Sequence, residues 1–186
     1  MSVTKNEAPP NLERIESLIR TIADFPSPGI LFRDLTPVLA DPAGFEAVLS
    51  AFEKICAADR PEAIVAIEAR GFLFGAPLAA RLRVPLIPVR KAGKLPFQVR
   101  KVSYALEYGT AELEMHTDAL AHGTRALVVD DVLATGGTAV AAAELVRSLG
   151  GTVSAFAFVV ELPGLGGAAR LREAGESGLV HSLVQY

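Results

Sequence analysis

Short, nearly continuous apolar runs alternate with helical stretches along most of the chain, and this alternation constrains the fold more than any other feature. Such strands are buried on both faces, and intervening helices let them pair in parallel. We therefore predict an open, mainly parallel α/β sheet flanked by helices. The predicted strands are AIVAIEAR (63–70), PLIPVRK (85–91), RALVVDD (125–131), TVSAFAFVVEL (152–162) and SGLVHSLVQ (177–185), and the helices between them cover 71–83 and 138–149.

The N-terminal part has a different pattern. Leu12, Ile15, Leu18, Ile19 and Ile22 recur at helical spacing, which predicts an amphipathic helix over 11–23. A second helix is expected from the Asp41-Pro42 pair, with Asp41 as its N-cap, to a point before Pro61. We predict a mobile tail over residues 1–11 and a single domain over 12–186.

A basic segment separates the second and third predicted sheet strands. KAGKLPFQVRKVS (91–103) contains no acid, and it leads into an alternating, hairpin-like ribbon, YALEYGTAELEMH (104–116). Because Gly93 and Pro96 interrupt a stretch with almost no pattern, we expect residues 92–103 to be mobile.

Composition restricts the partners and the location. The 186 residues carry a formal net charge of -3, which argues against nucleic acid as the main partner. No apolar stretch approaches the roughly 20 residues of a membrane span, so no membrane partner is expected. Cys56 is the only cysteine and the first residues do not resemble a signal peptide, so the prediction is a reduced, cytoplasmic protein. Cys56 itself is expected to be a small buried side chain.

The turn after the strand at 125–131 carries the densest chemistry. Gly136 and Gly137 let backbone N–H groups turn inward at a helix N-terminus, and Thr135 and Thr138 add hydroxyls, so a phosphate monoester fits there. Asp130 and Asp131, just upstream, could grip a ribose diol or, through it, Mg²⁺. The structural alternative is that the acids only cap the helix and the glycines only form a turn. No GxxxxGK[ST] and no GxGxxG after a strand is present.

This segment, VVDDVLATGGT (128–138), resembles the phosphoribosyl pyrophosphate (PRPP) signature of the type I phosphoribosyltransferases. Further segments resemble the adenine phosphoribosyltransferases of that family, and the resemblance covers residues 12–186. It implies the type I fold with a small N-terminal hood, a homodimer, and a role in purine salvage. The segments are FPSPGILFRDLTPVLADP (25–42), EARGFLFGAPLA (68–79), VRKAGKLP (89–96), YALEYGTAELEMHTDAL (104–120) and ELPGLGGAARL (161–171).

The resemblance implies transfer of the phosphoribosyl group from PRPP to adenine, giving AMP and pyrophosphate. Mg²⁺ would be held mainly by PRPP and water, with no direct protein ligand. The loop that excludes water from the reacting sugar would be the basic segment, with Tyr104 at its end. The implied contacts are Ala134, Thr135, Gly136, Gly137 and Thr138 for the 5′-phosphate, Asp130 and Asp131 for the ribose, and Arg70, Arg90, Lys91 and Lys94 for pyrophosphate.

The same resemblance gives Glu107, in LEYG, the acid/base role near the purine, and it assigns adenine binding to Leu31, Phe32, Arg33 and Val132. Alternatives stay open for some of these residues. Glu107 could be a surface glutamate on a strand, and Arg33 could be an ion-pair partner of Asp34.

Other functions are weaker alternatives. The PRPP motif does not distinguish adenine from hypoxanthine, guanine, xanthine or a pyrimidine as acceptor. A PRPP-sensing regulator would need a DNA-binding module that the sequence lacks. The three histidines show no metal-ligand spacing, and we expect structural or surface roles for them. One departure from the family pattern is that GGAARL (166–171) carries few charges.

Overall fold

The computed structural model describes residues 11–105, 109–176 and 178–186. Its contacts divide the chain into two compact units, Met1–Ala51 and Phe52–Tyr186, each of which is described by itself. The predicted tail lies outside the described residues except for Asn11, whose side chain accepts a hydrogen bond from the Arg14 backbone N–H at the start of the first helix.

The small unit combines short helices with a two-stranded hairpin. Asp41 joins its parts, because its carboxylate accepts the Gly44 N–H at 2.8 Å and pairs with Arg14 at 2.7 Å. The predicted helix after Asp41 and this capping contact are confirmed. The elements are α1 (Leu12–Leu18), β1 (Arg20–Ala23), β2 (Leu31–Asp34), α2 (Thr36–Ala40) and the start of α3 (Pro42–Asp59).

The helix predicted over 11–23 is wrong in its second half. Helix α1 ends at Leu18, and residues 20–23 form β1, which pairs antiparallel with β2 in the register Ile22 to Phe32. The apolar spacing of these residues fits both the helical period and the strand period. The turn through Pro26 and Pro28 brings β2 alongside, so the extended form gains a ladder of hydrogen bonds that a longer helix would lack.

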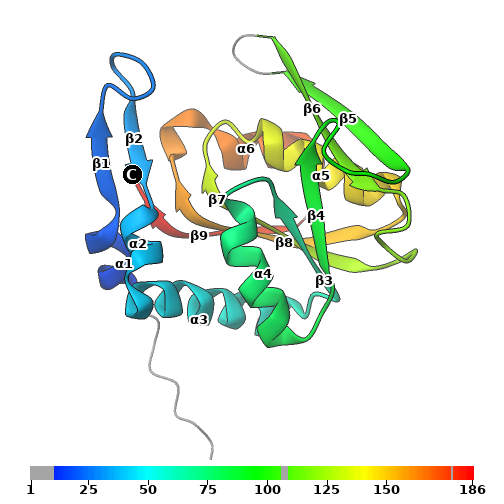
Figure 1. Cartoon of the computed structure of the whole chain (residues 1–186), viewed down its shortest axis with the longest axis horizontal. Coiled ribbons are helices and arrows are strands. Elements are labelled where there is room, and N and C mark those ends of the chain that lie inside the picture. Colours follow the sequence, from blue (N-terminus) through cyan, green and yellow to red (C-terminus); the bar gives the residue numbers. More distant parts are fainter. Residues whose placement is uncertain (1–10, 106–108, 177) are drawn as a thin grey trace, which may run out of the picture. The chain divides into compact units, whose positions relative to one another are not determined.

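The large unit is built on a seven-stranded sheet in the order β5-β6-β4-β3-β7-β8-β9 (Figure 1). Strands β4, β3, β7, β8 and β9 are parallel neighbours, whereas β5 and β6 form an antiparallel hairpin at the edge beside β4. The predicted mainly parallel α/β fold is confirmed. The elements are β3 (Ala63–Ile67), α4 (Gly71–Leu82), β4 (Leu86–Lys91), β5 (Val99–Ala105), β6 (Thr110–His116), β7 (Arg125–Leu133), α5 (Gly137–Ser148), β8 (Thr152–Glu161), η1 (Pro163–Leu165), α6 (Gly167–Glu173) and β9 (Leu179–Gln185).

Helices cover both faces of this sheet, as continuous apolar strands require. Val65 and Val128 point into the cluster that holds α5, while Ile64 and Ala66 face Gly75 of α4. A Cβ at position 75 would lie 2.6 Å from that of Ala66, so glycine lets α4 pack close to the sheet. Among the described helices, none has the length and apolar character of a membrane span.

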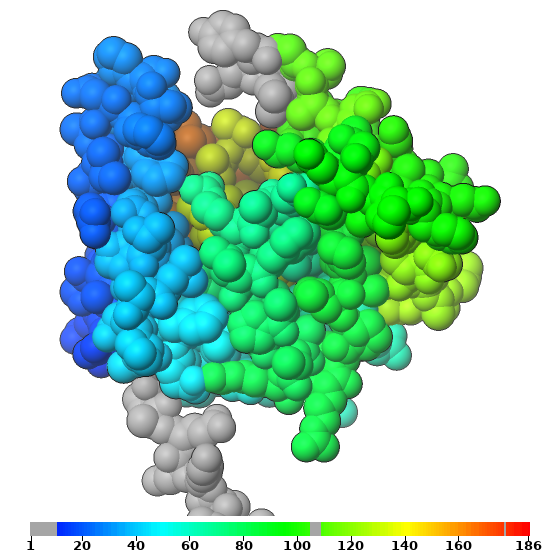
Figure 2. Space-filling view, in the orientation of Figure 1, coloured from blue at the N-terminus to red at the C-terminus, as the bar shows by residue number. Residues whose placement is uncertain are grey.

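The basic segment differs from its prediction. Residues 92–103 were expected to form a mobile loop, yet Val99–Ala105 form β5, which pairs with β6 over its whole length. The β5–β6 hairpin is visible at the molecular surface in Figure 2. Val102 is buried and Tyr104 packs against the same core, whereas Arg100, Lys101 and Ser103 are exposed, so few apolar residues mark this strand. That sparse pattern is why the sequence does not reveal the strand.

Candidate active site

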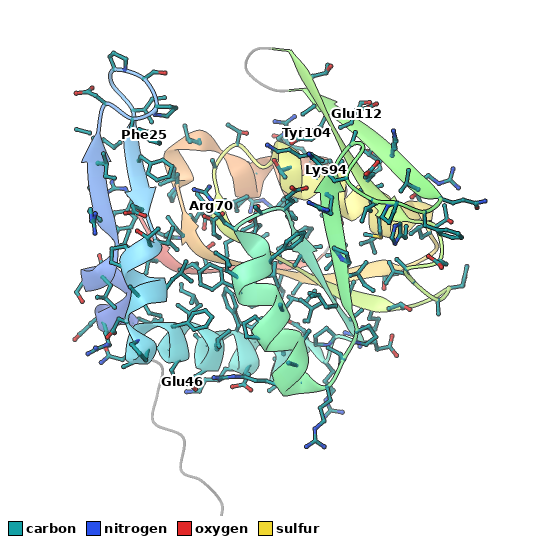
Figure 3. All side chains as sticks on the ribbon, in the orientation of Figure 1. Phe25, Glu46, Arg70, Lys94, Tyr104 and Glu112 are labelled. Carbon is teal, nitrogen blue, oxygen red and sulfur yellow. The ribbon has the colours of Figure 1, made fainter. Side chains whose placement is uncertain are left out.

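The carboxyl ends of β3, β4 and β7 meet around a cavity of about 320 Å³ in the large unit. Parallel sheets bind ligands at this edge, where the loops leave the strands. Arg70, Lys94 and Tyr104, labelled in Figure 3, come from the segments that follow β3 and β4 and from β5. The cavity is lined by Glu68, Ala69, Arg70, Lys91, Tyr104, Leu113, Asp130, Asp131, Val132, Ala134 and Thr138.

The predicted phosphate loop joins β7 to α5 and encloses a smaller cavity of about 80 Å³. Gly136 has φ of 79°, a left-handed conformation that glycine adopts without strain, and it is the N-cap of α5. The backbone therefore turns sharply at the positive end of the helix. The five residues predicted to hold a 5′-phosphate all line this smaller cavity, which makes a short anion cradle.

Asp130 lines both cavities, and Asp131 lines the larger one. The Asp131 backbone N–H donates to Oδ1 of Asp130 at 2.8 Å. Burial raises the pKa of Asp130 well above its usual value, and the neighbouring Asp131 carboxylate raises it further. Burial also raises the pKa of Asp131, although Arg70 opposes the shift. Burial thus outweighs the donors that this pair has in the described part of the chain, and shifts of this kind are typical of functional sites.

Arg70 forms an ion pair with this acid pair. Its Nε lies 2.7 Å from Oδ2 of Asp131, a buried oxygen that receives no hydrogen bond of good geometry within the described part of the chain. The Arg70 side chain is 52% exposed and so faces the cavity as well. One guanidinium thus touches the predicted ribose site and borders the space predicted for pyrophosphate.

Arg90 is engaged elsewhere. Its Nε and Nη2 donate to both carboxylate oxygens of Glu68, at 3.2 and 3.1 Å, and its Nη1 donates to the Lys94 carbonyl at 3.0 Å. Glu68 also accepts the Lys91 N–H at 3.0 Å. Burial would raise the pKa of Glu68, but Arg90 and the Lys91 N–H outweigh it and lower the pKa.

Glu114 on β6 holds the next part of the same segment. Its carboxylate is buried, and Oε1 accepts the N–H groups of Lys94 and Leu95 at 2.8 Å each. Burial again opposes ionisation, yet the backbone donors of Leu95, Gly93 and Lys94 together lower the pKa of Glu114. The buried Glu114 carboxylate therefore fixes the turn that carries Lys94.

Sequence reasoning missed both glutamates. Glu68 has a signal, because it follows the apolar strand at the carboxyl edge, in the sequence EAR. Glu114 has none, because it interrupts two buried neighbours, Leu113 and Met115, where an alternating ribbon predicts an outward residue.

Tyr104 extends from β5 to the phosphate loop. The Thr138 hydroxyl donates to the Tyr104 phenol oxygen at 3.5 Å, and the Tyr104 ring lies beside Gly137. Glu107, the predicted acid/base residue, lies outside the described residues.

The residues predicted to bind adenine belong to different units. Val132 lines the cavity of the large unit. Leu31, Phe32 and Arg33 lie on β2 of the small unit, where Phe32 packs edge-to-face on Phe25 and Arg33 donates to the Thr21 hydroxyl. Arg20 forms an ion pair with Asp34 at 3.8 Å. A shared role of these residues at adenine stays a prediction.

The histidines and Cys56 have surroundings that fit structural roles. His116 packs edge-to-face on Phe97, and His181 lies 3.4 Å from Asp59. The described residues contain no group of three or more His, Cys, Asp or Glu that could hold a metal. Cys56 is buried, and burial together with Asp59 and Glu53 raises its pKa to about 12, which keeps it a thiol.

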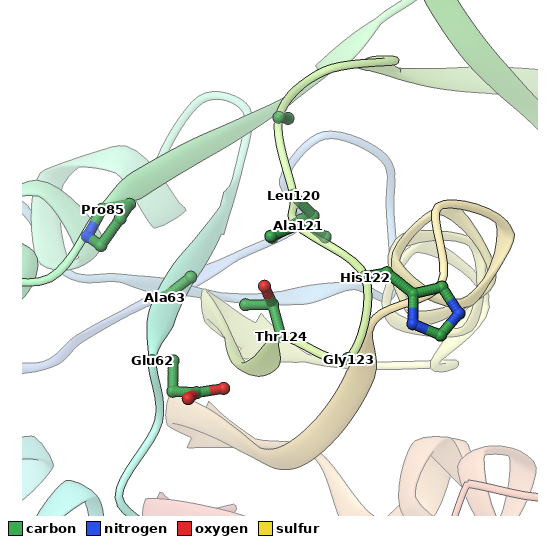
Figure 4. Close-up of a pocket in the computed structure, with 9 residues that line it drawn as sticks. Glu62, Ala63, Pro85, Leu120, Ala121, His122, Gly123 and Thr124 are labelled. Atoms are coloured by element: carbon green, nitrogen blue, oxygen red, sulfur yellow. The ribbon is translucent and has the colours of Figure 1, made fainter.

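A further cavity of about 380 Å³ lies at the opposite edge of the sheet, where β3 and β7 begin (Figure 4). Glu62 is its one carboxylate among the lining residues, and this group already accepts the Arg125 N–H at 2.9 Å. Its lining includes neither the cations of the cavity around Asp130 and Asp131 nor the glycine loop of the smaller cavity.

Comparisons with known proteins agree with this arrangement. The phosphoribosyl transferase domain family matches residues 35–170. Relatives named adenine phosphoribosyltransferase include one from Synechococcus sp. (strain CC9605), 54% identical over 92% of this chain and 98% of its own length. Another, from Sorangium cellulosum (strain So ce56), is 52% identical over 94% of this chain and 88% of its own length.

Solved structures agree as well. The adenine phosphoribosyltransferase from Thermoanaerobacter pseudethanolicus superposes with a TM-score of 0.88 at 48% identity, covering 94% of this chain and 99% of that one. The enzyme from Saccharomyces cerevisiae superposes with a TM-score of 0.87 at 38% identity, covering 92% and 97%. Because the family match spans most of the chain and the relatives are matched almost end to end, this chain belongs to the phosphoribosyltransferase family, in the branch of the adenine phosphoribosyltransferases.

Proposed function

We propose that this chain transfers the 5-phosphoribosyl group from PRPP to adenine, giving AMP and pyrophosphate, as a step of purine salvage. The observation that carries the proposal is the acid pair Asp130–Asp131 next to a glycine-rich phosphate cradle, with Arg70 and Lys91 lining the same cavity. The Saccharomyces cerevisiae relative was solved with adenine and an imino-altritol bisphosphate, and the Giardia lamblia relative with 9-deazaadenine.

The described residues supply the binding steps of this reaction. Backbone N–H groups of the loop from Ala134 to Thr138 hold the 5′-phosphate, and Asp130 and Asp131 accept hydrogen bonds from the ribose hydroxyls. Both ends of the sugar are then fixed, which aligns its reactive carbon. Arg70 and Lys91 attract the pyrophosphate as negative charge develops on it.

Magnesium fits this site. Carboxylate oxygens are ligands that Mg²⁺ prefers, and Oδ2 of Asp131 is buried without a hydrogen-bond donor of good geometry in the described residues. Mg²⁺ would be held mainly by PRPP and water beside this pair, and it would neutralise charge on the leaving diphosphate.

Arg90 and Lys94 have different proposed roles at this site. Because Glu68 and the Lys94 carbonyl engage all three nitrogens of the Arg90 guanidinium, we propose that Arg90 orients the segment that carries Lys91 and Lys94. Lys94 then contributes positive charge near the pyrophosphate from a turn that Glu114 holds.

For Glu107 we propose the acid/base role on the imidazole side of adenine, with closure of the basic segment over residues 92–103, which leads to Tyr104, excluding water. Replacing it in Glu107→Gln should lower kcat by ~10²-fold or more, on the usual scale of general acid/base catalysis, with little change in PRPP binding. Steady-state rates with both substrates measure this, and unchanged turnover would remove Glu107 from the role.

Leu31, Phe32, Arg33 and Val132 are proposed to form the adenine pocket, with backbone groups reading the amino group and ring nitrogens. An acceptor facing the exocyclic amine would reject hypoxanthine, whose carbonyl would face another acceptor. A single domain over residues 12–186, a homodimeric assembly and a cytoplasmic location complete the proposal.

The test is product analysis with the purified protein, Mg²⁺ and PRPP, offering adenine, hypoxanthine, guanine and uracil in separate reactions. The proposal expects AMP from adenine and no nucleotide from the other bases. Conversion of another base instead would refute the proposed adenine pocket and keep the PRPP site. No product from any base, with PRPP still binding in calorimetry, would contradict the activity and favour a PRPP sensor.

A further inference from the structure

The segment after β8 packs tightly on the phosphate loop. A Cβ added to Gly136 would lie 2.7 Å from the Gly167 carbonyl oxygen, and one added to Gly167 would lie 2.4 Å from the Ala134 carbonyl oxygen. Neither position tolerates a side chain, so the first turn of α6 lies directly on the backbone of the loop. In the sequence, this segment, GGAARL, stands out only for its few charges.

One of those few charges lies against the start of α5. A Cβ at Gly137 would meet Nη1 of Arg170 at 3.2 Å and its Cζ at 3.5 Å, with the Tyr104 ring 3.4 Å away. The Arg170 guanidinium therefore reaches the first residue of α5, where the backbone N–H groups of the cradle gather. Within residues 11–105, 109–176 and 178–186, no carboxylate forms an ion pair with Arg170.

The cradle itself lacks a cation. Its lining consists of Asp130 and the run from Val132 to Ala139, which contributes neutral side chains, backbone groups and one acid but no Lys or Arg. A phosphate monoester carries between one and two negative charges at neutral pH, and the Asp130 carboxylate nearby repels it. Neutral N–H donors satisfy its oxygens but leave most of this charge uncompensated.

We propose that Arg170 is a further phosphate-binding residue, whose guanidinium neutralises and hydrogen-bonds the 5′-phosphate held in the loop from Ala134 to Thr138. The inference rests on the proposed function, because it takes the phosphate to be that of PRPP and AMP. Arginine suits the task, since its planar fork can donate two parallel hydrogen bonds to phosphate oxygens. Gly137 leaves the space through which the guanidinium approaches.

The test compares two ligands of the same site by calorimetry, AMP and pyrophosphate with Mg²⁺, since only AMP carries the 5′-phosphate. Arg170→Gln should weaken AMP binding about tenfold or more, the usual effect of losing a hydrogen bond to a charged group, and leave pyrophosphate binding unchanged. Arg170→Lys keeps the charge but not the fork, so its AMP affinity should fall between those of Arg170→Gln and wild type.

The matched control is Arg172→Gln, because Arg172 lies on the same helix and is exposed. It should bind both ligands as the wild type does. AMP affinity of Arg170→Gln within twofold of wild type would overturn the inference and leave the proposed function intact. An equal loss for both ligands would also overturn it, because it would show a general distortion of the site. If the wild type bound no AMP, the proposed function itself would fall, and this inference with it.

Discussion

Two pairs of acids lie at or near the same cavity, and their ionisation is shifted in opposite directions. The pKa values of Asp130 and Asp131 are raised, chiefly by burial. Those of Glu68 and Glu114 are lowered, although burial opposes this, because Arg90 and backbone N–H groups donate to them. All four carboxylates come from the ends of strands or from the hairpin beside them, so their place in the fold does not explain the difference.

In the proposed function, the difference separates acids that support the site from acids that bind ligand. A buried carboxylate without enough donors costs free energy, whereas one with several charge-assisted hydrogen bonds stabilises the fold. Glu68 and Glu114 find their donors in the protein and hold the basic segment in place. In the proposed function, Asp130 and Asp131 gain further donors when a sugar or a hydrated cation binds. Asp130 and Asp131 therefore lower the stability of the folded protein, whereas Glu68 and Glu114 raise it.

The largest expected effect is that of Asp131→Asn. This variant loses the proposed charged acceptor for the ribose hydroxyls and the ion-pair partner of Arg70, so kcat/KM for PRPP should fall ~10²-fold, the scale of hydrogen bonds to charged groups. Saturation curves with varied PRPP measure the loss, and Asp118→Asn, at an exposed aspartate, is the control. Normal PRPP saturation in Asp131→Asn would refute the role of Asp131 at the ribose hydroxyls, and with it the contrast between the two acid pairs.

A smaller effect is expected from Glu114→Gln, which keeps the shape but removes the charge that orients the turn at Lys94. Stability should fall by about 1–3 kcal/mol, and the affinity for pyrophosphate with Mg²⁺ should fall severalfold because Lys94 is no longer held. Urea unfolding and calorimetry measure the two quantities. Glu112→Gln, on the exposed position two residues earlier, should change neither, and equal behaviour of the two variants would refute the bracing role.

The pH dependence of stability should show the contrast directly. Because folding raises the pKa of Asp130 and Asp131, their contribution falls as pH rises from the ordinary value of 3.8 towards the raised one. Because folding lowers the pKa of Glu68 and Glu114, their contribution is present above 4.5 and is lost as pH falls through the lowered values.

Unfolding free energies measured in urea at a series of pH values test these signs. Asp130→Asn should remove part of the decline on the alkaline side of 3.8, and Glu114→Gln part of the loss on the acid side of 4.5. If the unfolding free energies of the two variants depended on pH in the same way, folding would not shift the ionisation of Asp130 and Glu114 in opposite directions.

The smallest effect is expected from Lys101→Gln. Lys101 lies 3.9 Å from the Glu114 carboxylate across the hairpin and is 47% exposed, so solvent screens the pair. Stability should change by about 0–1 kcal/mol and pyrophosphate affinity by less than twofold. A loss as large as that of Glu114→Gln would mean that the lysine, and not the backbone N–H groups, is the main partner of Glu114.

The sequence predicts the ligand side of this comparison better than the supporting side. VVDDVLATGGT is local, so its acids, glycines and hydroxyls come together through one turn, and the strand and helix around it follow from apolar period. Glu114 meets Lys94 only because β6 pairs beside β4, and Arg170 meets Gly137 only because two glycines let α6 approach the loop. Contacts of this kind depend on how strands and helices pack in the fold, so no local sequence pattern predicts them.

The prediction of secondary structure failed in the same way where the apolar spacing fits both a helix and a strand. Residues 19–23 fit a helix by spacing, and only the partner strand β2 selects the extended form. Val99–Ala105 look irregular because the strand buries little on its own and is stabilised by its pairing with β6. The buried strands of the large unit, which carry their own apolar signal, were predicted within a few residues.

The most direct test of the contrast is thermal unfolding of Asp130→Asn and Glu114→Gln side by side, without ligand and near neutral pH. The account predicts that Asp130→Asn unfolds at a higher temperature than wild type, because a poorly solvated charge is gone while the amide oxygen can still accept the Asp131 N–H. It predicts that Glu114→Gln unfolds at a lower temperature. A lower unfolding temperature for both variants would contradict it, because the aspartates would then be structural acids like the glutamates.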